Sequence, residues 1–180
     1  MTKKTVLPKY KPMPELEEFE QLVGKFIQYW GFKKIHGRIW AHLYTSDIPL
    51  DSQTLIARLK VSKGLMSLAI RDLIEYAVIE AVSVGKHGVT YYHASPDIVA
   101  VITNVLRKRE AVMMSAVSSC LKRMNSKGKQ QLQLAGLSLN KLEDVLKMTD
   151  SAQGLLNLFI LQGSASNNAE NIKIFSEFKI

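Results

Sequence analysis

The sequence predicts a mainly α-helical protein with a small β-hairpin wing: a winged helix-turn-helix followed by a helical dimerisation region. Three observations lead to this fold class. Two short amphipathic helices with a tight turn between them fit residues 51–76, and a β-rich hairpin pattern follows over residues 78–93. Residues 98–124 then keep a helical spacing of apolar side chains without a Gly or Pro. Helix, turn, helix and basic-tipped hairpin, in this order, are typical of a winged helix-turn-helix.

The chain divides by composition into three expected parts. These are a flexible basic arm over residues 1–14, a winged helix-turn-helix domain with an N-terminal helix over 15–97, and a helical linker and dimerisation region over 98–180. The arm carries four lysines and three prolines and has little to bury. We interpret it as loosely docked. The alternative is an arm that touches a DNA backbone or a partner subunit.

Two helices are expected ahead of the helix-turn-helix. The first, over residues 15–30, begins with acidic side chains, which suit the positive end of a helix. Its apolar side chains recur on one face, at Leu16, Phe19, Val23, Phe26, Ile27 and Trp30. Gly31 suits a helix C-terminus. The second helix is predicted over residues 36–45, with Ile39 and Leu43 directed inward.

The helix-turn-helix has recognisable caps and faces. Asp51 can accept the free N–H groups in the first turn of one helix, and Ser62 can cap the next. A buried stripe is predicted along the second helix, at Met66, Ile70, Leu73 and Ala77. The opposite side holds small, basic and apolar residues: Lys63, Gly64, Leu65, Ser67, Leu68 and Arg71. This small, basic outer face indicates a helix that enters a DNA major groove.

The wing is predicted from two β-rich segments with a turn between them. Residues 78–84 form one strand and residues 89–93 the other. The connecting turn is Gly85-Lys86-His87-Gly88, which would place Lys86 and His87 at the wing tip.

The C-terminal region is predicted to be helical throughout. The helix over 98–124 would be about 40 Å long, which is more than a small domain can cover. A polar break follows, and then a helix from Ser138 and another that restarts at Asp150. Residues 163–171 are expected to form a loop, followed by an apolar tail. These terminal helices carry more apolar surface than one small core can use, which favours a two-fold homodimer.

Composition favours a cytoplasmic protein with a polyanionic partner. The formal net charge is +8 and the pI is near 9.5. The basic excess is not confined to a tail, because residues 1–95 hold 13 Lys/Arg and 9 Asp/Glu and residues 96–180 hold 11 and 7. The single Cys120 rules out an intramolecular disulfide and fits a reducing compartment. No signal peptide or apolar run long enough to cross a bilayer is present, so no membrane association is expected.

The sequence resembles the MarR superfamily of winged helix-turn-helix regulators and, within it, the GbsR-like branch. The resemblance covers roughly residues 31–94. It is carried by Gly37-Arg38-Ile39, Pro49-Leu50, Val61-Ser62-Lys63-Gly64, the recognition-helix residues Ser67, Arg71 and Leu73, and Tyr91-Tyr92 at the end of the wing. Lys60 departs from the family pattern, which usually has a turn Gly there, and the wing tip lacks the Arg often found at its end.

The resemblance implies a sequence-specific DNA-binding transcriptional regulator, a homodimeric repressor of a palindromic operator in double-stranded DNA. The family positions that would face DNA are Ser62, Lys63, Gly64, Ser67 and Arg71, with Lys86 and His87 at the wing tip. Leu65 and Leu68 would add apolar contact with thymine methyl groups. Several relatives control genes for compatible solutes such as glycine betaine or ectoine, and some respond to choline-like ligands.

A small-molecule effector of that kind suggests an aromatic cage. The candidate effector-binding residues are Tyr29, Trp30, Trp40 and Tyr44, which would hold a quaternary ammonium by cation–π attraction. Ordinary core packing of these rings is the alternative.

Other readings of the same residues stay open. Arg71 could pair with Glu75 on a solvated helix face. Leu65 and Leu68 could instead form the partner surface of a winged-helix protein–protein interaction module without specific DNA binding. Cys120 is interpreted as a small core residue, with a redox-active thiolate as the alternative. A second basic group is interpreted as a solvated face, with contact to flanking phosphates as the alternative: Arg107, Lys108, Arg109, Lys122, Arg123, Lys127 and Lys129.

No enzyme chemistry is indicated. The sequence holds no Gly-rich phosphate loop, nucleophile elbow or carboxylate pair with a groove to work in, so neither an enzyme nor a cofactor is predicted. No metal site is expected either, because His36, His42, His87 and His93 do not combine with Cys or acidic residues at metal-ligand spacing.

Overall fold

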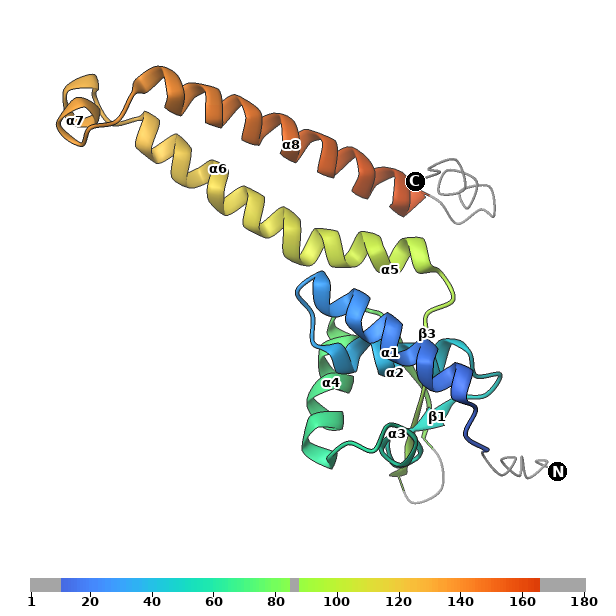
Figure 1. Ribbon diagram of the computed structural model, residues 1–180. Coiled ribbons are helices and arrows are strands. Elements are labelled where there is room, and N and C mark those ends of the chain that lie inside the picture. The colour runs from blue at the N-terminus through green and yellow to red at the C-terminus, as the bar shows by residue number, and fades with distance from the viewer. Residues whose placement is uncertain (1–10, 85–87, 166–180) are drawn as a thin grey trace. The chain divides into compact units, whose positions relative to one another are not determined.

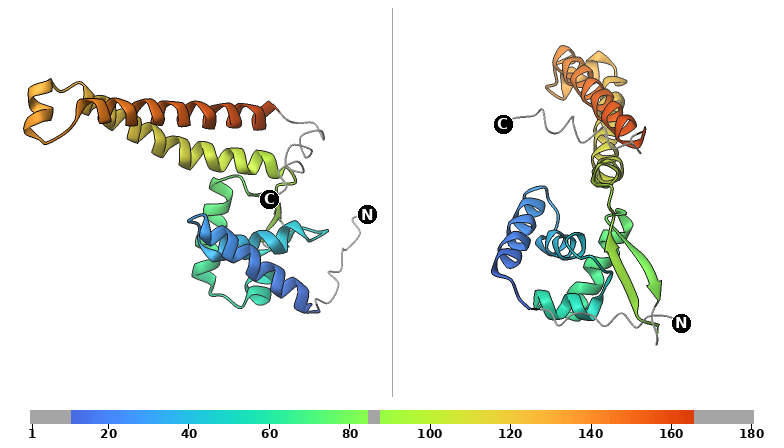
Figure 2. Two further views of the ribbon diagram at one scale, coloured as in Figure 1. Left: turned by 45° about the horizontal axis from the view of Figure 1, so that its top comes forward. Right: turned by 90° about the vertical axis from the view of Figure 1, so that its right-hand side faces the viewer.

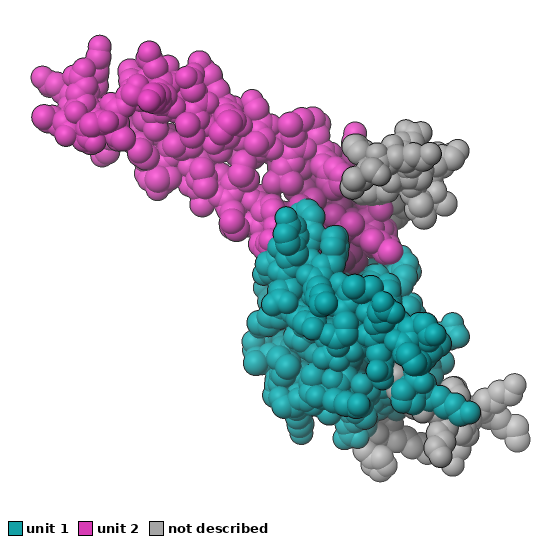
Figure 3. Space-filling view, viewed as in Figure 1, with its two compact units in different colours: residues 1–96 teal, residues 97–180 magenta. Residues whose placement is uncertain are grey.

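The computed structural model describes residues 11–84 and 88–165 and divides the chain into two compact units. Unit 1 is residues 1–96 and unit 2 is residues 97–180 (Figure 3). The boundary expected from the sequence, between residues 97 and 98, lies one residue from this division. The two units are described separately below.

Unit 1 is a helix-turn-helix packed on a small antiparallel sheet. Its elements in chain order are α1 (Pro14–Tyr29), α2 (Lys34–Tyr44), β1 (Leu50–Asp51), α3 (Ser52–Leu59), α4 (Lys63–Glu75), β2 (Ile79–Val84) and β3 (Thr90–Ala94) (Figure 1). The strand order is β1-β3-β2, and both pairings are antiparallel. The predicted hairpin is therefore present, and the two-residue strand β1 is an addition to it. The predicted fold class, mainly α with a small winged sheet, is confirmed.

The core of unit 1 lies between α2, α3, α4 and one face of the sheet (Figure 2). Its most deeply buried side chains come from each of these elements: Ile39, Leu50, Leu55, Met66 and Ile79. The apolar side chains that recur along the two helices of the helix-turn-helix thus point into this core.

The caps expected from the sequence are both formed. Asp51 Oδ1 accepts a hydrogen bond from Thr54 N at 2.6 Å, and Ser62 Oγ accepts one from Leu65 N at 3.2 Å. Between the two helices Lys60 adopts the left-handed conformation, with φ 54°. A residue with a Cβ pays about 1 kcal/mol for that conformation, as expected from the absence of a Gly at this turn.

Part of the predicted stripe on α4 is corrected. Met66, Ile70 and Leu73 are buried, but Ala77 lies beyond the end of the helix with φ 55° and is only half-buried. Ala69 occupies the fourth buried position. The helix ends earlier than its pattern suggests because the chain turns at Ala77 to enter β2.

The aromatic residues of helix α1 do not lie on the side that packs against the rest of unit 1. Its buried residues are Glu20 and Gly24, whereas Phe19, Phe26 and Trp30 are 39%, 61% and 54% exposed. The reason is a close crossing of α1 and α2 at two glycines. A Cβ on Gly37 would lie 2.7 Å from the Val23 carbonyl oxygen and 2.9 Å from the Gly24 Cα. Bulky rings cannot enter such a contact, so they lie on the outer side of α1.

Unit 2 is a helical hairpin. Its first arm consists of α5 (Ile98–Val105), the π-helical turn η2 (Leu106–Glu110) and α6 (Ala111–Asn125). The short helix α7 (Lys129–Leu134) leads into α8 (Leu139–Ala165), which returns along the first arm (Figure 1). None of the helices among the described residues is long and apolar enough to cross a membrane.

The predicted restart of a helix at Asp150 is wrong, because α8 is continuous from residue 139 to 165. The Asp150 carboxylate is engaged by α6 and is not available as a cap: it accepts a hydrogen bond from Ser118 Oγ at 2.8 Å and lies 3.4 Å from Lys122 Nζ. Residues 163–165 of the expected loop belong to α8. The rest of that loop and the apolar tail lie outside the described residues.

The two arms of the hairpin meet along a heptad seam. The α8 residues at a and d spacing are all buried or half-buried: Leu139, Leu142, Leu146, Thr149, Gln153, Leu156, Ile160 and Gly163. Such a repeat is the pattern of helices packed as a coiled coil. The seam contains several polar or small residues, so most of the large apolar side chains of unit 2 lie elsewhere.

One set of exposed, mostly apolar side chains on α6 and α8 is here called the outer stripe. On α8 they follow a second a and d spacing, at Val145, Met148, Ala152, Leu155 and Phe159, and all are exposed. On α6 the exposed residues Met113, Val117 and Cys120 continue it. The prediction that Cys120 is a small core residue is therefore wrong: it lies on an apolar stripe, but on the one that the hairpin leaves exposed.

Candidate nucleic-acid interface

The residues predicted on the outer face of α4 lie together on one exposed surface. Ser62, Lys63, Gly64, Leu65, Ser67, Leu68 and Arg71 are all exposed, and the opposite face of the helix is buried in the core. We call this set the α4 outer face. Leu65 and Leu68 are 39% and 46% exposed, which is unusual for leucines of a core helix. The α4 outer face thus presents three small residues, two cations and two apolar side chains away from its own domain.

Gly64 has no packing role in the chain itself. A Cβ built at this position would meet no atom within 4 Å, so no neighbouring element requires a glycine here. The backbone lies in an ordinary helical region, since Gly64 is not among the positive-φ glycines. The missing side chain instead leaves the first turn of α4 open to close approach from outside.

Replacing Gly64 by Ala should therefore separate stability from binding. We expect the variant to be more stable by about 0.5 kcal/mol, because Ala is the better helix former. Its affinity for operator DNA should fall by about 1–2 kcal/mol, because a methyl group would stand between helix and groove. Urea unfolding and anisotropy titration would measure the two effects. Unchanged affinity in the stabilised variant would remove Gly64 from the interface.

No acidic side chain in the part of the chain that the structure describes pairs with the cations of the α4 outer face. Neither Lys63 nor Arg71 forms an ion pair within residues 11–84 and 88–165, so the alternative pairing of Arg71 with Glu75 is not seen. The acidic Asp72 turns to α2, where Lys33 Nζ and His36 Nε2 lie 2.8 and 3.2 Å from its Oδ2. The hydrogen bond from Lys33 lowers the pKa of Asp72, and burial lowers that of His36.

The wing strands carry a register irregularity. Strand β2 pairs with β3 from Ile79↔Ala94 to Val84↔Thr90, with a bulge between Ala81 and Ser83. Gly88 has φ +76°, which glycine adopts without strain. The predicted tip residues Lys86 and His87 lie outside the described residues, and their contact with DNA stays a prediction.

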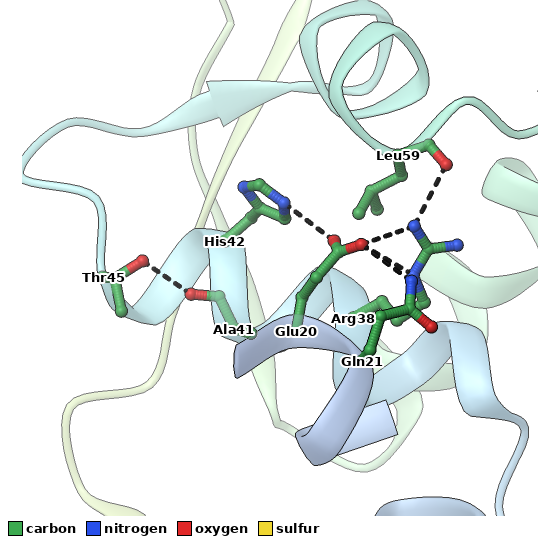
Figure 4. Close-up of polar contacts among 7 residues, drawn as sticks. All are labelled: Glu20, Gln21, Arg38, Ala41, His42, Thr45 and Leu59. Atoms are coloured by element: carbon green, nitrogen blue, oxygen red, sulfur yellow. Dashed lines mark hydrogen bonds and ion pairs between the residues drawn. The ribbon is translucent and has the colours of Figure 1, made fainter. Parts of the chain in front are cut away.

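A buried polar cluster was missed by the reading of the sequence (Figure 4). Glu20 of α1 is only 3% exposed, and its Oε1 accepts hydrogen bonds from Arg38 Nη2 at 2.6 Å and Nε at 3.1 Å. Its Oε2 lies 2.9 Å from His42 Nε2. Burial lowers the pKa of His42, against the opposing effect of the Glu20 carboxylate. Arg38 Nη2 also donates to the carbonyl oxygen of Leu59, at 3.2 Å.

The sequence did contain a signal for this cluster. Glu20 was grouped with the other acidic residues at the start of α1. It nevertheless lies in helical phase with Leu16, Val23 and Ile27, all of which are half-buried in the structure. An acidic residue in phase with apolar ones indicates a buried carboxylate, which requires a cationic partner.

Two of the four aromatic residues proposed for an effector contact each other, and a third contacts a ring outside the set. Trp40 stacks on Tyr44 with ring centroids 4.6 Å apart, and Trp30 meets Phe26 edge-on at 6.2 Å. Tyr29 is 88% exposed. Tyr44 also borders an open cavity of about 520 Å³, which Ser46, Asp47 and His93 help to line. The cage stays a prediction.

Unit 2 carries the second basic group. Within it, Arg109 Nε lies 2.8 Å from Glu110 Oε1, and Lys122 Nζ lies 3.4 Å from Asp150 Oδ1. Among the described residues, no group of three or more His, Cys, Asp or Glu side chains could hold a metal ion.

Comparisons with known proteins agree with the fold. No family model matches the chain, and no curated protein is significantly similar in sequence. One crystal structure, of a protein described as a transcriptional regulator, is similar with a TM-score of 0.63 over 84% of this chain and 99% of the other. The two chains are 19% identical, so the similarity concerns the fold alone. The chain therefore shares with that protein a mainly helical fold with a small antiparallel sheet.

Proposed function

We propose that this protein is a sequence-specific DNA-binding transcriptional regulator, a homodimeric repressor that inserts α4 into the major groove. One observation carries the proposal: on the side of the helix opposite the core, the α4 outer face combines small residues, exposed leucines and two cations that have no ion-pair partner among the described residues. The helix-turn-helix order and the adjoining wing give this face the geometry that groove-reading helices use.

Each residue of the α4 outer face has a distinct expected contact. Lys63 lies in the first turn of α4, where the helix dipole also favours an anion, and is assigned to a phosphate. Arg71, two turns further on, is long enough to reach guanine O6 and N7 with its fork of donors. Gly64 and Ser67 leave space for base edges, and Leu65 and Leu68 suit thymine methyl groups.

The outer stripe of unit 2 supports the dimer. Met148 and Leu155 are 66% and 70% exposed and lie one coiled-coil repeat apart, and Met113 on α6 is 63% exposed. A hairpin that leaves such a stripe uncovered gains by pairing with a second copy, and a two-fold pair is the commonest arrangement. Two copies of α4 would then read the half-sites of a palindromic operator.

An effector and the target genes are proposed from the resemblance to GbsR-like regulators. A compatible solute or a choline-like molecule would shift the dimer between a geometry that binds the operator and one that does not. The repressor would then control compatible-solute genes. A thermal shift on adding choline, lost in Trp40→Ala, would support this assignment.

The decisive test is an anisotropy titration of the protein's own upstream DNA with the wild type and Arg71→Ala. We expect Arg71→Ala to lose about 1–3 kcal/mol of specific binding, because the fork to guanine is lost, and to retain most non-specific binding. Lys63→Ala should instead reduce the slope of log K against log salt by about one. Lys147→Ala, on exposed α8, is the charge-matched control.

The exposed leucines favour one second candidate, a winged-helix protein–protein interaction module. In that case the α4 outer face would bind an apolar partner surface, and binding would change little with salt. A wild type that prefers no DNA sequence, with a shallow salt slope, would favour the module.

A further inference from the structure

The contact between Arg38 and the turn of the helix-turn-helix links three helices through one guanidinium. Arg38 extends from α2, its Nε and Nη2 bind Glu20 of α1, and Nη2 also binds the Leu59 carbonyl (Figure 4). Leu59 is the last residue of α3, and the chain reverses immediately after it, at Lys60. Carbonyls in the last turn of a helix have no partner within the helix, so Arg38 satisfies one that the turn leaves open.

The turn held in this way is the connection that sets the position of α4. Only Lys60, Val61 and Ser62 separate the end of α3 from the first residue of α4. Lys60 is held in a left-handed conformation that a lysine does not favour. Because the left-handed backbone of Lys60 is unfavourable by itself, the turn keeps one geometry only if a contact from elsewhere in the domain stabilises it. The Arg38 guanidinium supplies such a contact, a charge-assisted hydrogen bond.

Glu20 in turn fixes the guanidinium. Its carboxylate accepts two hydrogen bonds from Arg38 and is itself held by Gln21 Nε2 at 3.1 Å and by His42. The arginine side chain is 18% exposed and that of Glu20 is 4% exposed, so water competes little for these bonds. The planar fork of Arg can bind the carboxylate and the carbonyl together, which a Lys ammonium on its flexible stem does less well.

We propose that Arg38 is a positioning residue for DNA recognition: held by Glu20, it fixes the α3–α4 turn and thereby the orientation of the α4 outer face. This role rests on the proposed function in that DNA is the ligand that α4 meets. The same linkage makes α1 part of the recognition apparatus, because a movement of α1 that displaced Glu20 would release the turn.

The test combines binding with amide hydrogen exchange in the full-length protein. Arg38→Lys keeps the charge and removes the fork. The double variant Glu20→Gln with Arg38→Met removes the ion pair as a unit, so that no buried charge is left unpaired. Lys33→Met is the matched control: it breaks another contact between α2 and α4, at Asp72, without touching the turn. Exchange is followed at the amides of Lys60, Leu65 and Met66, whose hydrogen bonds define the turn and the start of α4.

We expect Arg38→Lys to remain folded at 25 °C and to exchange these amides at least about tenfold faster, with little change at the end of α4. Specific DNA affinity should fall by about the same factor, while non-specific affinity stays constant. The double variant should show the same pattern and Lys33→Met should not. If Arg38→Lys fails to fold, the double variant decides.

Two results of the exchange measurement would overturn the role of Arg38: unchanged exchange at the turn, or a uniform increase over all of unit 1, which would mark a purely structural residue. Unchanged specific affinity with a loosened turn would likewise exclude positioning. A wild type without any preferred DNA sequence would refute the proposed function, and the exchange measurement would still decide whether Arg38 fixes the turn.

Discussion

A chain in which Met148 and Leu155 are both replaced by Glu is expected to be monomeric and to lose at least about a hundredfold of its operator affinity. Both residues lie on the outer stripe, where a dimer would surround them with apolar side chains. A carboxylate buried there without a partner opposes association. A monomer can occupy only one half-site, and the effective concentration that joins two half-sites is commonly worth 10²–10⁴ in affinity.

Light scattering after gel filtration and anisotropy titration would measure both effects. Leu134→Glu is the matched control, because Leu134 is 89% exposed but lies on α7, outside the stripe. A double variant that remains dimeric would show that the dimer uses another surface. Full operator affinity in a monomeric variant would instead contradict recognition by two half-sites.

Gly37→Ala is expected to destabilise the protein by about 2–3 kcal/mol, although alanine normally favours helices. The new methyl carbon would lie 2.7 Å from the Val23 carbonyl oxygen and 2.9 Å from the Gly24 Cα. Both are backbone atoms, so no side-chain rotation relieves the contact and α1 must move away from α2. Overpacking of this kind typically costs 1–3 kcal/mol.

Urea unfolding gives the free energy directly. Gly154→Ala is the control, since Gly154 also lies within a helix but has no atom within 4 Å of a built Cβ. That variant should gain about 0.5–1 kcal/mol. If Gly37→Ala were as stable as the wild type, the close crossing of α1 and α2 would not be essential to the fold. A large loss should also weaken DNA binding, because α1 carries Glu20.

The winged helix was predictable because its signals are local. Asp51 and Ser62 cap helices through hydrogen bonds to residues three positions further along the chain. The spacing of apolar residues in α4 indicates which side of this helix is exposed. The α4 outer face followed from that spacing alone. Local rules of this kind need no knowledge of what lies across the core.

The features that were missed depend on partners far along the chain. Glu20 pairs with residues on another helix: its phase with the apolar residues of α1 indicates burial, but it cannot tell which cation the carboxylate meets. A helix was predicted to restart at Asp150 because the pairing of its carboxylate with Ser118, on the other arm of the hairpin, could not be inferred from the sequence. Cys120 was placed on the correct stripe, but the pattern could not tell which of two stripes each helix turns inward.

The π-helical turn η2 explains how the first arm of the hairpin keeps its seam. Up to the end of the turn, buried or half-buried residues recur at Val99, Thr103, Leu106 and Glu110; after it they recur at Ala111, Met114, Ser118, Leu121 and Asn125. The two series differ in heptad phase by one residue. Two heptads after Thr103 is position 117, but the buried residue at the equivalent place is Ser118. A π turn accommodates one additional residue without breaking the helix. The heptad repeat thus contains one additional residue, which the wider π-helical turn accommodates. The length of the segment 106–110 therefore determines which sides of α5 and α6 face the same seam.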